Sequence, residues 1–403
     1  MFPGSQPLSG LDVLVADPGL LGFRRPGLLT NHAAVTAGLA RGVDALVAAG
    51  ITPHCLIAPE HGYWGSEQAG EGGGETRDAR TGIPVLSSYG VHGAALVQLL
   101  ADSGIDGLLV DLQDIGCRFF TYPWSMVDAM AACAELDLPV HVLDRPAPLA
   151  MRPLGPGTDE RCASFVGRMD IPLRHGGRLG DIARHAAAHH LERSLDLTVT
   201  AAPGADGSAP WVPPSPNMPT PTTLALYPGT GLVEGCTWSE GRGTTLPFEV
   251  LGAPWADHRL ADALRGAGMP GLEVRELEVR ATHGVFADEA VHGVQLHLLE
   301  DPRDFVARED VDPLRIGHTV LAAMHALHPA SAGDFWRRNT ASSPLFIDLL
   351  WGSGALREGI DDGASYEEIL AASPAPHPLL DPSATGADQD APAPRSDAPG
   401  SPA

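Results

Sequence analysis

The first 150 residues alternate between short apolar runs and segments with helical spacing, and this alternation constrains the fold more than any other feature. The apolar runs occur at residues 27–30, 55–58, 84–87, 107–111 and 140–143. The segments between them in which apolar residues recur every three or four positions are 35–47, 93–103 and 124–136. Strands that alternate with helices form a parallel sheet with helices on both faces. The sequence therefore predicts a doubly wound parallel sheet.

From Met151 onward, proline and glycine interrupt the chain more often. The features predicted there are a helix at 179–191, a stiff proline-rich loop at 213–220, a half-buried strand at 293–298 and a helix starting at Asp312-Pro313. The last 31 residues, 373–403, hold eight prolines and no aromatic side chain, so they bury too little apolar surface to become ordered. We expect an N-terminal domain of residues 1–150, a smaller α/β (α+β) domain of residues 151–372 and a disordered tail of residues 373–403.

Four of the predicted strands end in polar clusters. These clusters are Asn31-His32, Glu60-His61, Asp111 to Asp114, and Asp144-Arg145. The carboxyl ends of parallel strands lie at one edge of a sheet, where ligands bind in α/β proteins. A strand needs some polar residues to leave the core, but four clusters exceed that need. They indicate a functional crevice.

Glu60 is the first choice for a catalytic residue. Pro59 cannot donate a hydrogen bond to a neighbouring strand, so the strand should end there and place Glu60 and His61 just past it. A glutamate in a crevice can give or take a proton, and an adjacent histidine can position a substrate hydroxyl. The alternatives are a salt-bridged, inert carboxylate and a structural histidine.

Asp111 and Asp114 allow three interpretations: a carboxylate pair for acid–base chemistry, part of a metal site, or caps of the following turn. Arg118 and Tyr122 are suited to holding an anionic or hydroxylated ligand, although Arg118 could instead pair with either aspartate. The segment 239–244 is only superficially similar to a phosphate-binding loop, and a tight turn that presents Glu240 and Arg242 to the crevice explains it better.

Composition excludes several functions. All 26 basic residues are arginine, which rules out lysine-based Schiff bases and a Walker-type phosphate lysine. A net charge of −24 argues against a nucleic-acid partner. The five cysteines form no C-x-x-C pair, which argues against disulfides and a zinc–thiolate site. No apolar run is long enough for a membrane span, and residues 1–6 have no basic region of a secretory signal, so we predict a cytoplasmic protein without a membrane partner.

Several motifs together resemble one family. They are Leu29-Thr30-Asn31-His32, Pro59-Glu60-His61-Gly62, the segment from Asp111 to Tyr122, Leu143-Asp144-Arg145-Pro146, Pro172 to Gly176, Pro214 to Thr220, and Ser239 to Thr244. In this order, from about Gly10 to Ile369, they resemble the exo-β-N-acetylmuramidases of the NamZ type, formerly DUF1343. The resemblance implies a Rossmann-like N-terminal domain, a smaller second domain and an active site in the cleft between them.

The resemblance also implies a reaction: hydrolysis of a terminal, non-reducing, β-linked N-acetylmuramic acid (MurNAc) from peptidoglycan fragments, with no cofactor or metal. MurNAc-GlcNAc fragments would be the partners. The family's proposed catalytic glutamate corresponds to Glu60, as acid/base residue, and the second carboxylate is undecided among Asp111, Asp114 and Glu240. The residues expected to bind substrate are Asn31, His32, His61, Asp114, Arg118, Tyr122, Asp144, Arg145, His175, Asn217 and Arg242. One of the arginines would meet the lactyl carboxylate of MurNAc.

Two other functions stay open. Relatives often carry Val-Glu-Gly-Pro where this chain has Pro153-Leu154-Gly155-Pro156, so a sugar-binding protein that has lost catalysis is one alternative. A metal-dependent hydrolase is the other, with His32, His61 and His175 alongside Glu60 and Asp111, although these histidines lack the spacing of common metal motifs. Relatives also tend to end in an ordered, aromatic-rich segment, which the tail replaces here.

Overall fold

A seven-stranded sheet forms the centre of the first domain in the computed structural model, which describes residues 9–71, 74, 76–201, 210–338 and 344–379. Its strand order is β3-β4-β2-β1-β5-β6-β7, and all neighbouring strands are parallel except β3 and β4. The strands are β1 (Pro26–Thr30), β2 (Cys55–Ala58), β3 (Thr76–Arg77), β4 (Pro84–Ser87), β5 (Gly107–Asp111), β6 (Val140–Leu143) and β7 (Leu197–Thr200). The predicted doubly wound parallel sheet is confirmed.

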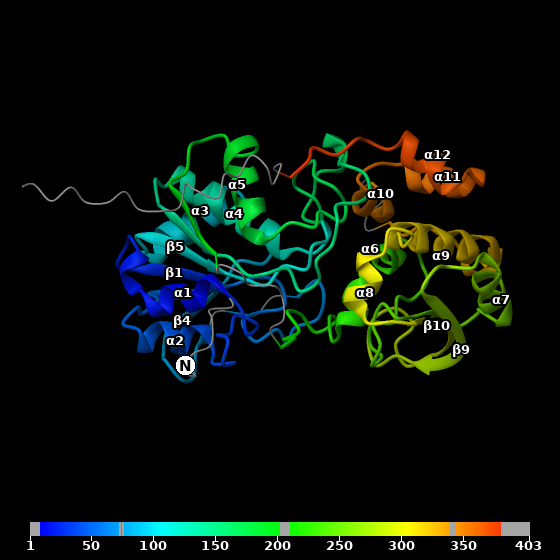
Figure 1. Cartoon of the computed structure of the whole chain (residues 1–403), viewed down its shortest axis with the longest axis horizontal. Helices are drawn as coiled ribbons and strands as arrows, with labels where there is room; N and C mark the ends of the chain where they lie inside the picture. Colours follow the sequence, from blue (N-terminus) through cyan, green and yellow to red (C-terminus); the bar gives the residue numbers. More distant parts are fainter. Residues whose placement is uncertain (1–8, 72–73, 75, 202–209, 339–343, 380–403) are drawn as a thin grey trace, which may run out of the picture.

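Helices cover both faces of this sheet (Figure 1). They are α1 (Gly10–Ala16), α2 (Gly42–Ala48), α3 (Ala94–Ser103), α4 (Tyr122–Glu135) and α5 (Leu179–His189), with short 3-10 turns at Pro18–Leu20 and Glu160–Cys162. Successive residues of a strand point to opposite faces. Leu28 accordingly joins the core beneath α1 and α2, whereas Leu29 joins the larger core beneath α3, α4 and α5.

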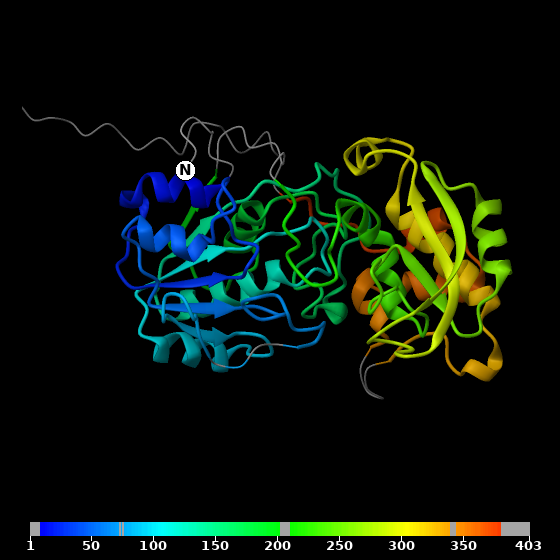
Figure 2. The same ribbon diagram turned by 90° about the horizontal axis from the view of Figure 1, so that it is seen from below.

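The second domain is built on a small antiparallel sheet with the order β8-β10-β9. Its strands are β8 (Val250–Ala253), β9 (Leu272–Arg280) and β10 (Ala290–Leu298). Its helices are α6 (Pro221–Thr230), α7 (His258–Ala267), α8 (Pro302–Ala307), α9 (Pro313–Leu327), α10 (Phe346–Trp351), α11 (Ala355–Asp362) and α12 (Tyr366–Ala372), with 3-10 turns η3 (Gly231–Gly235) and η4 (Ala330–Ala332). Figure 2 shows the two domains side by side. No helix in the described ranges is both long and apolar enough to cross a membrane.

We propose that the boundary between the domains lies later than residue 150. Strand β7 extends the first sheet by pairing with β6, and α5 packs against β6 and β7. The proline- and glycine-rich character that begins at Met151 belongs to long connections between β6 and α5, which contain only one short 3-10 turn. The second domain then begins near α6.

One predicted helix begins too early. The apolar spacing suggested a helix over residues 35–47, but α2 starts at Gly42. Val35 pairs instead with Arg41 across a tight turn, and Leu39 there adopts a positive φ of 61°, which a helix does not allow. The spacing of Val35 and Leu39 was therefore fortuitous, and both belong to the loop that follows β1.

The start of the tail is ordered, contrary to expectation. Trp351 donates its indole N–H to Ser373 Oγ (2.9 Å), Gly157 donates to the carbonyl of Pro374 (2.9 Å), and the amide of His377 donates to the carbonyl of Asp170 (3.1 Å). Backbone hydrogen bonds, which composition does not report, hold this segment on the first domain. Residues 380–403, and residues 1–8 on which the absence of a signal was argued, lie outside the described ranges.

Truncation after Ala372 is therefore expected to lower stability. It removes three hydrogen-bond partners at about 1 kcal/mol each, so we expect a loss of about 1–3 kcal/mol and a melting temperature several degrees lower. The matched control is truncation after Leu379, which keeps every contact described here. Differential scanning calorimetry of both proteins decides the matter, and equal melting temperatures would show that the segment contributes nothing.

His141 on β6 makes the stability of the first domain sensitive to acid. Burial lowers its pKa to about 4, and its Nε2 lies 2.7 Å from Thr200 Oγ1. A histidine whose pKa is lower in the folded state destabilises the fold as pH falls, because the unfolded chain takes up the proton first, near pH 6.5. Stability from this residue is complete above about pH 6.5 and is lost progressively down to about pH 4.

We expect His141→Gln to flatten the pH dependence of unfolding. Between pH 7 and pH 5 the unmodified chain should lose about 1–2 kcal/mol more than the variant, measured by urea unfolding at each pH. His54→Gln is the control, because that histidine is exposed just before β2 and should leave the slope unchanged. Equal slopes for all three proteins would mean that His141 does not titrate in this range.

Candidate active site

Glu60 lies just beyond the carboxyl end of β2, and both of its carboxylate oxygens accept hydrogen bonds. Thr121 donates its hydroxyl to Oε2 (2.6 Å), and the backbone amide of Gly70 donates to Oε1 (2.8 Å). The side chain is nearly buried, with 8% of the residue exposed. Glu60 is therefore held rigidly, without an ion-pair partner among the described residues.

His61 follows Glu60 with a positive φ of 70°, which turns the chain sharply after the strand. Its Nδ1 lies 2.9 Å from the carbonyl of Glu67. A carbonyl can only accept, so Nδ1 carries the proton of the neutral ring and Nε2 is left as an acceptor. The ring meets Tyr122 edge to face, with 6.5 Å between centroids. This tautomer suits an imidazole that receives a hydroxyl proton.

Asn31, His32 and Tyr122 hold the proline-rich loop. Asn31 Nδ2 donates to the Tyr122 hydroxyl (2.8 Å) and to the carbonyl of Pro214 (2.9 Å), and Tyr122 donates to the same carbonyl (2.7 Å). His32 Nε2 lies 3.0 Å from the carbonyl of Pro213. Proline has no N–H, so this loop offers acceptors to the donors that face it. The three side chains predicted to bind substrate therefore shape the wall of the site.

Asn217 lies in the same loop and is buried, with 6% exposed. Its Nδ2 has no hydrogen-bond partner among the residues that the structure describes. A buried amide without a partner costs free energy, which a ligand acceptor would recover. The amide group of Asn217 therefore has N–H donors available for a ligand, as expected of a binding residue.

The second domain contributes a group of charges on the turn after η3. Arg242 donates to Glu240 (2.8 Å) and to Glu234 (3.0 Å), and its guanidinium lies 4.7 Å from the ring centre of Phe248. Gly241 adopts a φ of 86°, which confirms the tight turn expected from the sequence. Glu240 and Arg242 thus lie together as predicted.

Glu234 was missed by the sequence analysis. Burial raises its pKa, Arg242 opposes that effect, and the negative charges of Glu240 and Glu60 add to the increase. The charge of Glu60 also contributes to a raised pKa of Tyr227, on α6, where burial is the main cause. Glu60 of the first domain is therefore within electrostatic reach of Glu234 of the second. We call Glu60, Glu234, Glu240 and Arg242 the glutamate site.

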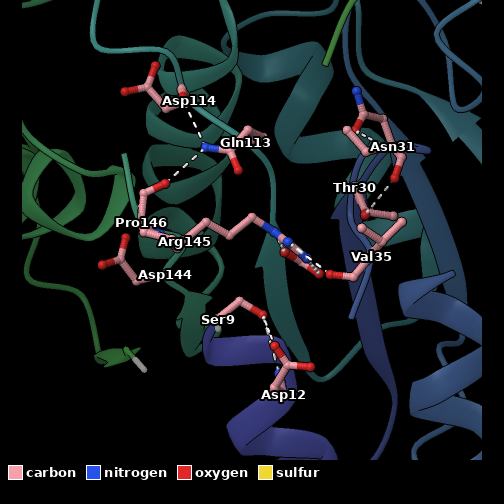
Figure 3. A network of polar contacts seen from close by, with 12 residues as sticks. Ser9, Asp12, Thr30, Asn31, Val35, Gln113, Asp114, Asp144, Arg145 and Pro146 are labelled. Carbon is pink, nitrogen blue, oxygen red and sulfur yellow. Dashed lines mark hydrogen bonds and ion pairs between the residues drawn. The ribbon is translucent and has the colours of Figure 1, made fainter. Parts of the chain in front are cut away.

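Asp111 and Arg145 form a buried ion pair. Arg145 Nε donates to Asp111 Oδ1 (2.5 Å) and Nη2 donates to Oδ2 (2.9 Å), while Nη1 donates to the carbonyl of Val35 (3.0 Å). Figure 3 shows the arginine extended from Pro146 toward Val35. Both aspartate oxygens are occupied by the guanidinium, which is a poor arrangement for proton transfer. Asp111 is therefore not favoured as the second carboxylate.

Asp114, His175 and Asp144 form a separate buried cluster. Asp114 Oδ2 lies 3.4 Å from His175 Nε2. Burial raises the pKa of Asp114 to about 7 and lowers that of His175 to about 3, so His175 is neutral. Asp144 accepts from the amide of Gly180 (2.9 Å) at the start of α5, and burial raises its pKa to about 6. These residues hold loops together, and none has a described contact with Glu60.

Arg118 joins the two domains. Its Nη1 donates to the carbonyls of Pro156 (2.7 Å) and Ile171 (2.8 Å), and its Nη2 donates to those of Leu350 (3.3 Å) and Trp351 (2.7 Å). The residue is fully buried, and burial lowers its pKa to about 10. Arg118 pairs with neither Asp111 nor Asp114 and is closed to a ligand, so it ties domains together instead of binding substrate.

The histidines considered for a metal centre do not assemble. In the ranges that the structure describes, no group of three His, Cys, Asp or Glu side chains is arranged to hold a metal ion. His32 faces Pro213, His61 faces Glu67 and His175 faces Asp114, so their ring nitrogens point to three different places.

Comparisons with known proteins agree in covering nearly all of the chain. Residues 27–222 match the family model "Exo-beta-N-acetylmuramidase NamZ, N-terminal", and residues 225–375 match its C-terminal counterpart. The chain is 36% identical over 375 residues to the peptidoglycan beta-N-acetylmuramidase NamZ of Bacillus subtilis (strain 168), covering 90% of this chain and 86% of that protein.

Two crystal structures of DUF1343 family proteins from Bacteroides fragilis are similar in fold. They superpose with TM-scores of 0.75 and 0.71, each at 30% identity, over 91% of this chain and 94% of theirs. The division between the two family models, at residues 222 and 225, falls close to the start of α6.

Proposed function

Because this chain belongs to the NamZ family of exo-β-N-acetylmuramidases, we propose that it hydrolyses the terminal β-linked MurNAc of peptidoglycan fragments at the glutamate site. The observation that carries this proposal is that Glu60 of the first domain lies within electrostatic reach of Glu234 of the second, which is paired with Arg242 beside Glu240. Glycoside hydrolysis usually requires two carboxyl groups, one that protonates the leaving oxygen and one that acts as nucleophile or base. Location in the cytoplasm stays a prediction from the sequence.

The environments of the two glutamates support a division of roles. Glu60 is held in place by hydrogen bonds from Thr121 and Gly70. Glu234 is mostly shielded from solvent, with 16% of its side chain exposed, and this desolvation raises its pKa, with a further contribution from Glu240 and Glu60 that Arg242 opposes. Pairs of carboxyl groups whose surroundings push their pKa values apart supply both an acid and a base at one pH. We propose Glu60 and Glu234, in place of Asp111 or Asp114, as the two carboxyl groups of the reaction, with Glu234 suited to donate a proton and Glu60 to accept one.

Arg242 is the arginine best placed for the lactyl carboxylate of MurNAc. Arg118 and Arg145 are engaged elsewhere, by carbonyls and by Asp111. Arg242 has five N–H groups, of which Glu234 and Glu240 engage one nitrogen each, while its buried Nε has no partner among the described residues. A planar guanidinium with donors left over is suited to binding a carboxylate.

A pair of chromogenic substrates tests the function. We expect turnover of a β-N-acetylmuramide and much weaker turnover of the matched β-N-acetylglucosaminide, which lacks the lactyl carboxylate. Addition of a chelator should change neither rate. Equal or faster cleavage of the glucosaminide would contradict a site built for MurNAc. Sensitivity to the chelator would favour a metal-dependent hydrolase.

Glu234→Gln is expected to lower kcat on the muramide by about 10²–10⁴-fold, the range for loss of a general acid or base. Glutamine cannot release a proton, so the fall in rate at high pH that reports Glu234 should also disappear. Glu240→Gln, on the turn that follows η3, is the matched comparison, because Glu240 also pairs with Arg242, and its effect should be clearly smaller. A larger loss with Glu240→Gln would make Glu240 the second carboxylate.

A further inference from the structure

A cavity of about 340 Å³ lies at the carboxyl ends of β1, β5 and β6. Its walls include Gln113 after β5, Arg145 after β6 and Arg303 from α8 of the second domain. The strand order of the sheet reverses between β1 and β5, and ligands of open α/β sheets bind outside the strand ends at such a reversal. The position of this cavity therefore favours a ligand.

The cavity and the glutamate site border different parts of one loop. Trp211 and Val212 line the cavity, whereas the next two residues, Pro213 and Pro214, accept hydrogen bonds from His32 and Tyr122. Neither Glu60 nor Glu234 lines the cavity. A ligand there would be separate from the reacting bond.

Arg145 and Gln113 offer donors and an acceptor to this cavity, which Arg303 and Asp12 also line with one charge of each sign. Arg145 has five N–H groups and uses three of them on Asp111 and Val35, so two are left. Its charge is neutralised by Asp111. Gln113 donates from Nε2 to the carbonyls of Asp114 (2.9 Å) and Pro146 (3.3 Å), and its Oε1 accepts no bond from the described residues (Figure 3).

On the opposite wall of the cavity, the carboxylate of Asp12 already accepts hydrogen bonds from the protein. Ser9 donates its hydroxyl to Asp12 Oδ2 (2.9 Å), and the amide of Ala37 donates to Oδ1 (2.9 Å), as Figure 3 shows for the first of these bonds. Both oxygens of Asp12 thus have donors within the protein, which disfavours a cationic ligand.

Trp211 supplies a fixed aromatic surface. Its indole N–H donates to the carbonyls of Met218 and Pro219, both at 3.2 Å, so its polar atom is occupied and its carbon surface remains for a ligand. The neighbouring Pro146 and Pro210 add rigid apolar surface. An apolar surface with a few convergent polar groups is the usual make-up of a small-molecule site.

We infer that this cavity binds one uncharged sugar unit, separate from the MurNAc that is cleaved. Its volume is near the lower limit of about 300 Å³ for small-molecule sites, which suits a single ring. The spare N–H groups of Arg145 and the Oε1 of Gln113 match the hydroxyls of a sugar, and Trp211 matches its apolar face. A phosphate would find no uncompensated positive charge at Arg145. The identity of the sugar rests on the proposed function: we choose N-acetylglucosamine because peptidoglycan fragments contain it.

Methyl β-N-acetylglucosaminide is the probe, titrated by isothermal calorimetry into the full-length Glu60→Gln protein. Ala37 lines the cavity and contributes only its backbone amide to Asp12, so Ala37→Phe fills the cavity and keeps that bond. We expect saturable binding that weakens at least tenfold when Ala37→Phe is added. Chromogenic muramide turnover should be unchanged by Ala37→Phe in the active enzyme. Leu299→Ala, at an exposed leucine of the second domain, is the control.

A second set of variants guards against misfolding. Trp211→Ala removes both the ring and its hydrogen bonds, whereas Trp211→Phe restores an aromatic surface without the N–H. Binding that Trp211→Ala abolishes and Trp211→Phe largely retains would support the sugar site. Unchanged affinity in both Ala37→Phe and Trp211→Ala, or no saturable binding to Glu60→Gln, would overturn it.

Longer substrates identify the source of the sugar. A KM for tetrasaccharide fragments that rises in Ala37→Phe, with no change for the chromogenic muramide, would assign the cavity to a unit of the same glycan. Loss of monosaccharide binding alone would assign it to free sugar. If the muramide is not cleaved at all, the proposed function fails, while the calorimetric titration still decides the cavity.

Discussion

Replacing Glu60 by glutamine is expected to lower kcat on a chromogenic muramide by about 10²–10⁴-fold, the contribution of a positioned acid or base. Glutamine has nearly the same shape, and its carbonyl oxygen can still accept from Thr121 or Gly70, so the fold should be kept. The amide cannot exchange a proton with the glycosidic oxygen or with water. Initial rates and thermal unfolding curves of the same preparations measure the two effects separately.

The control for this variant is Glu192→Gln, an exposed glutamate after α5. It should match the unmodified enzyme in both rate and melting temperature. A Glu60→Gln protein that keeps more than a tenth of the activity would move the chemistry to Glu234 and Glu240. A Glu60→Gln protein that unfolds at a clearly lower temperature would make Glu60 a structural carboxylate, which was the alternative raised by the sequence.

Arg118→Met is expected to give the largest loss of stability, about 3–5 kcal/mol. The substitution leaves the buried carbonyls of Ile171, Leu350 and Trp351 without their donor, whereas the Pro156 carbonyl keeps the amide of Leu173. Each unsatisfied group costs about 1–3 kcal/mol, and removal of a buried charge offsets part of the total. The loss falls on the contact between the domains, so muramide turnover should fall as well.

Urea unfolding at pH 7 measures this loss of stability, and two further variants serve for comparison. Arg118→Lys should recover only part of the stability, since one ammonium cannot span carbonyls that four separate guanidinium bonds now reach. Arg161→Met is the control, because that side chain is 88% exposed. A stability change below 1 kcal/mol for Arg118→Met would mean that water replaces the guanidinium without cost.

The sheet could be predicted from sequence because its central strands are buried on both faces. The runs that became β1, β2, β5 and β6 are mostly apolar, with His141 as an interior exception in β6, and every one of their residues is buried. Each run is followed by a polar cluster. Helices were harder to delimit, as the late start of α2 shows. A period of three or four residues does not report a positive φ such as that of Leu39.

The candidate site was predictable only in part. The strand ends place Asp111, Asp144 and Arg145 at one edge of the sheet. The sequence does not say which of the two carboxylates forms an ion pair with the arginine, and in the structure it is Asp111. Arg118 was expected to meet a ligand or an aspartate, whereas its partners are backbone carbonyls, which leave no mark in a sequence. These pairings depend on tertiary contacts more than 30 residues apart.

Glu234 shows where a usable signal existed. It is the one charged residue in the segment from Gly231 to Trp238, whose other members are apolar, glycine or threonine. Burying a carboxylate in such a run is unfavourable unless a basic residue pairs with it, and the partner, Arg242, lies eight residues further on. Searching for lone charges in apolar segments would have found it.

The ordered segment that follows α12 has a consequence for motion. The chain passes between the domains once before α6 and again where Pro374 and His377 bond back to Gly157 and Asp170. Arg118, and the ring contact of Phe119 with Tyr227 at 4.9 Å between centroids, add further ties between the same two domains. We therefore expect the domains to move little relative to each other, so that Glu60 and Glu234 keep a nearly constant separation while a glycan end binds.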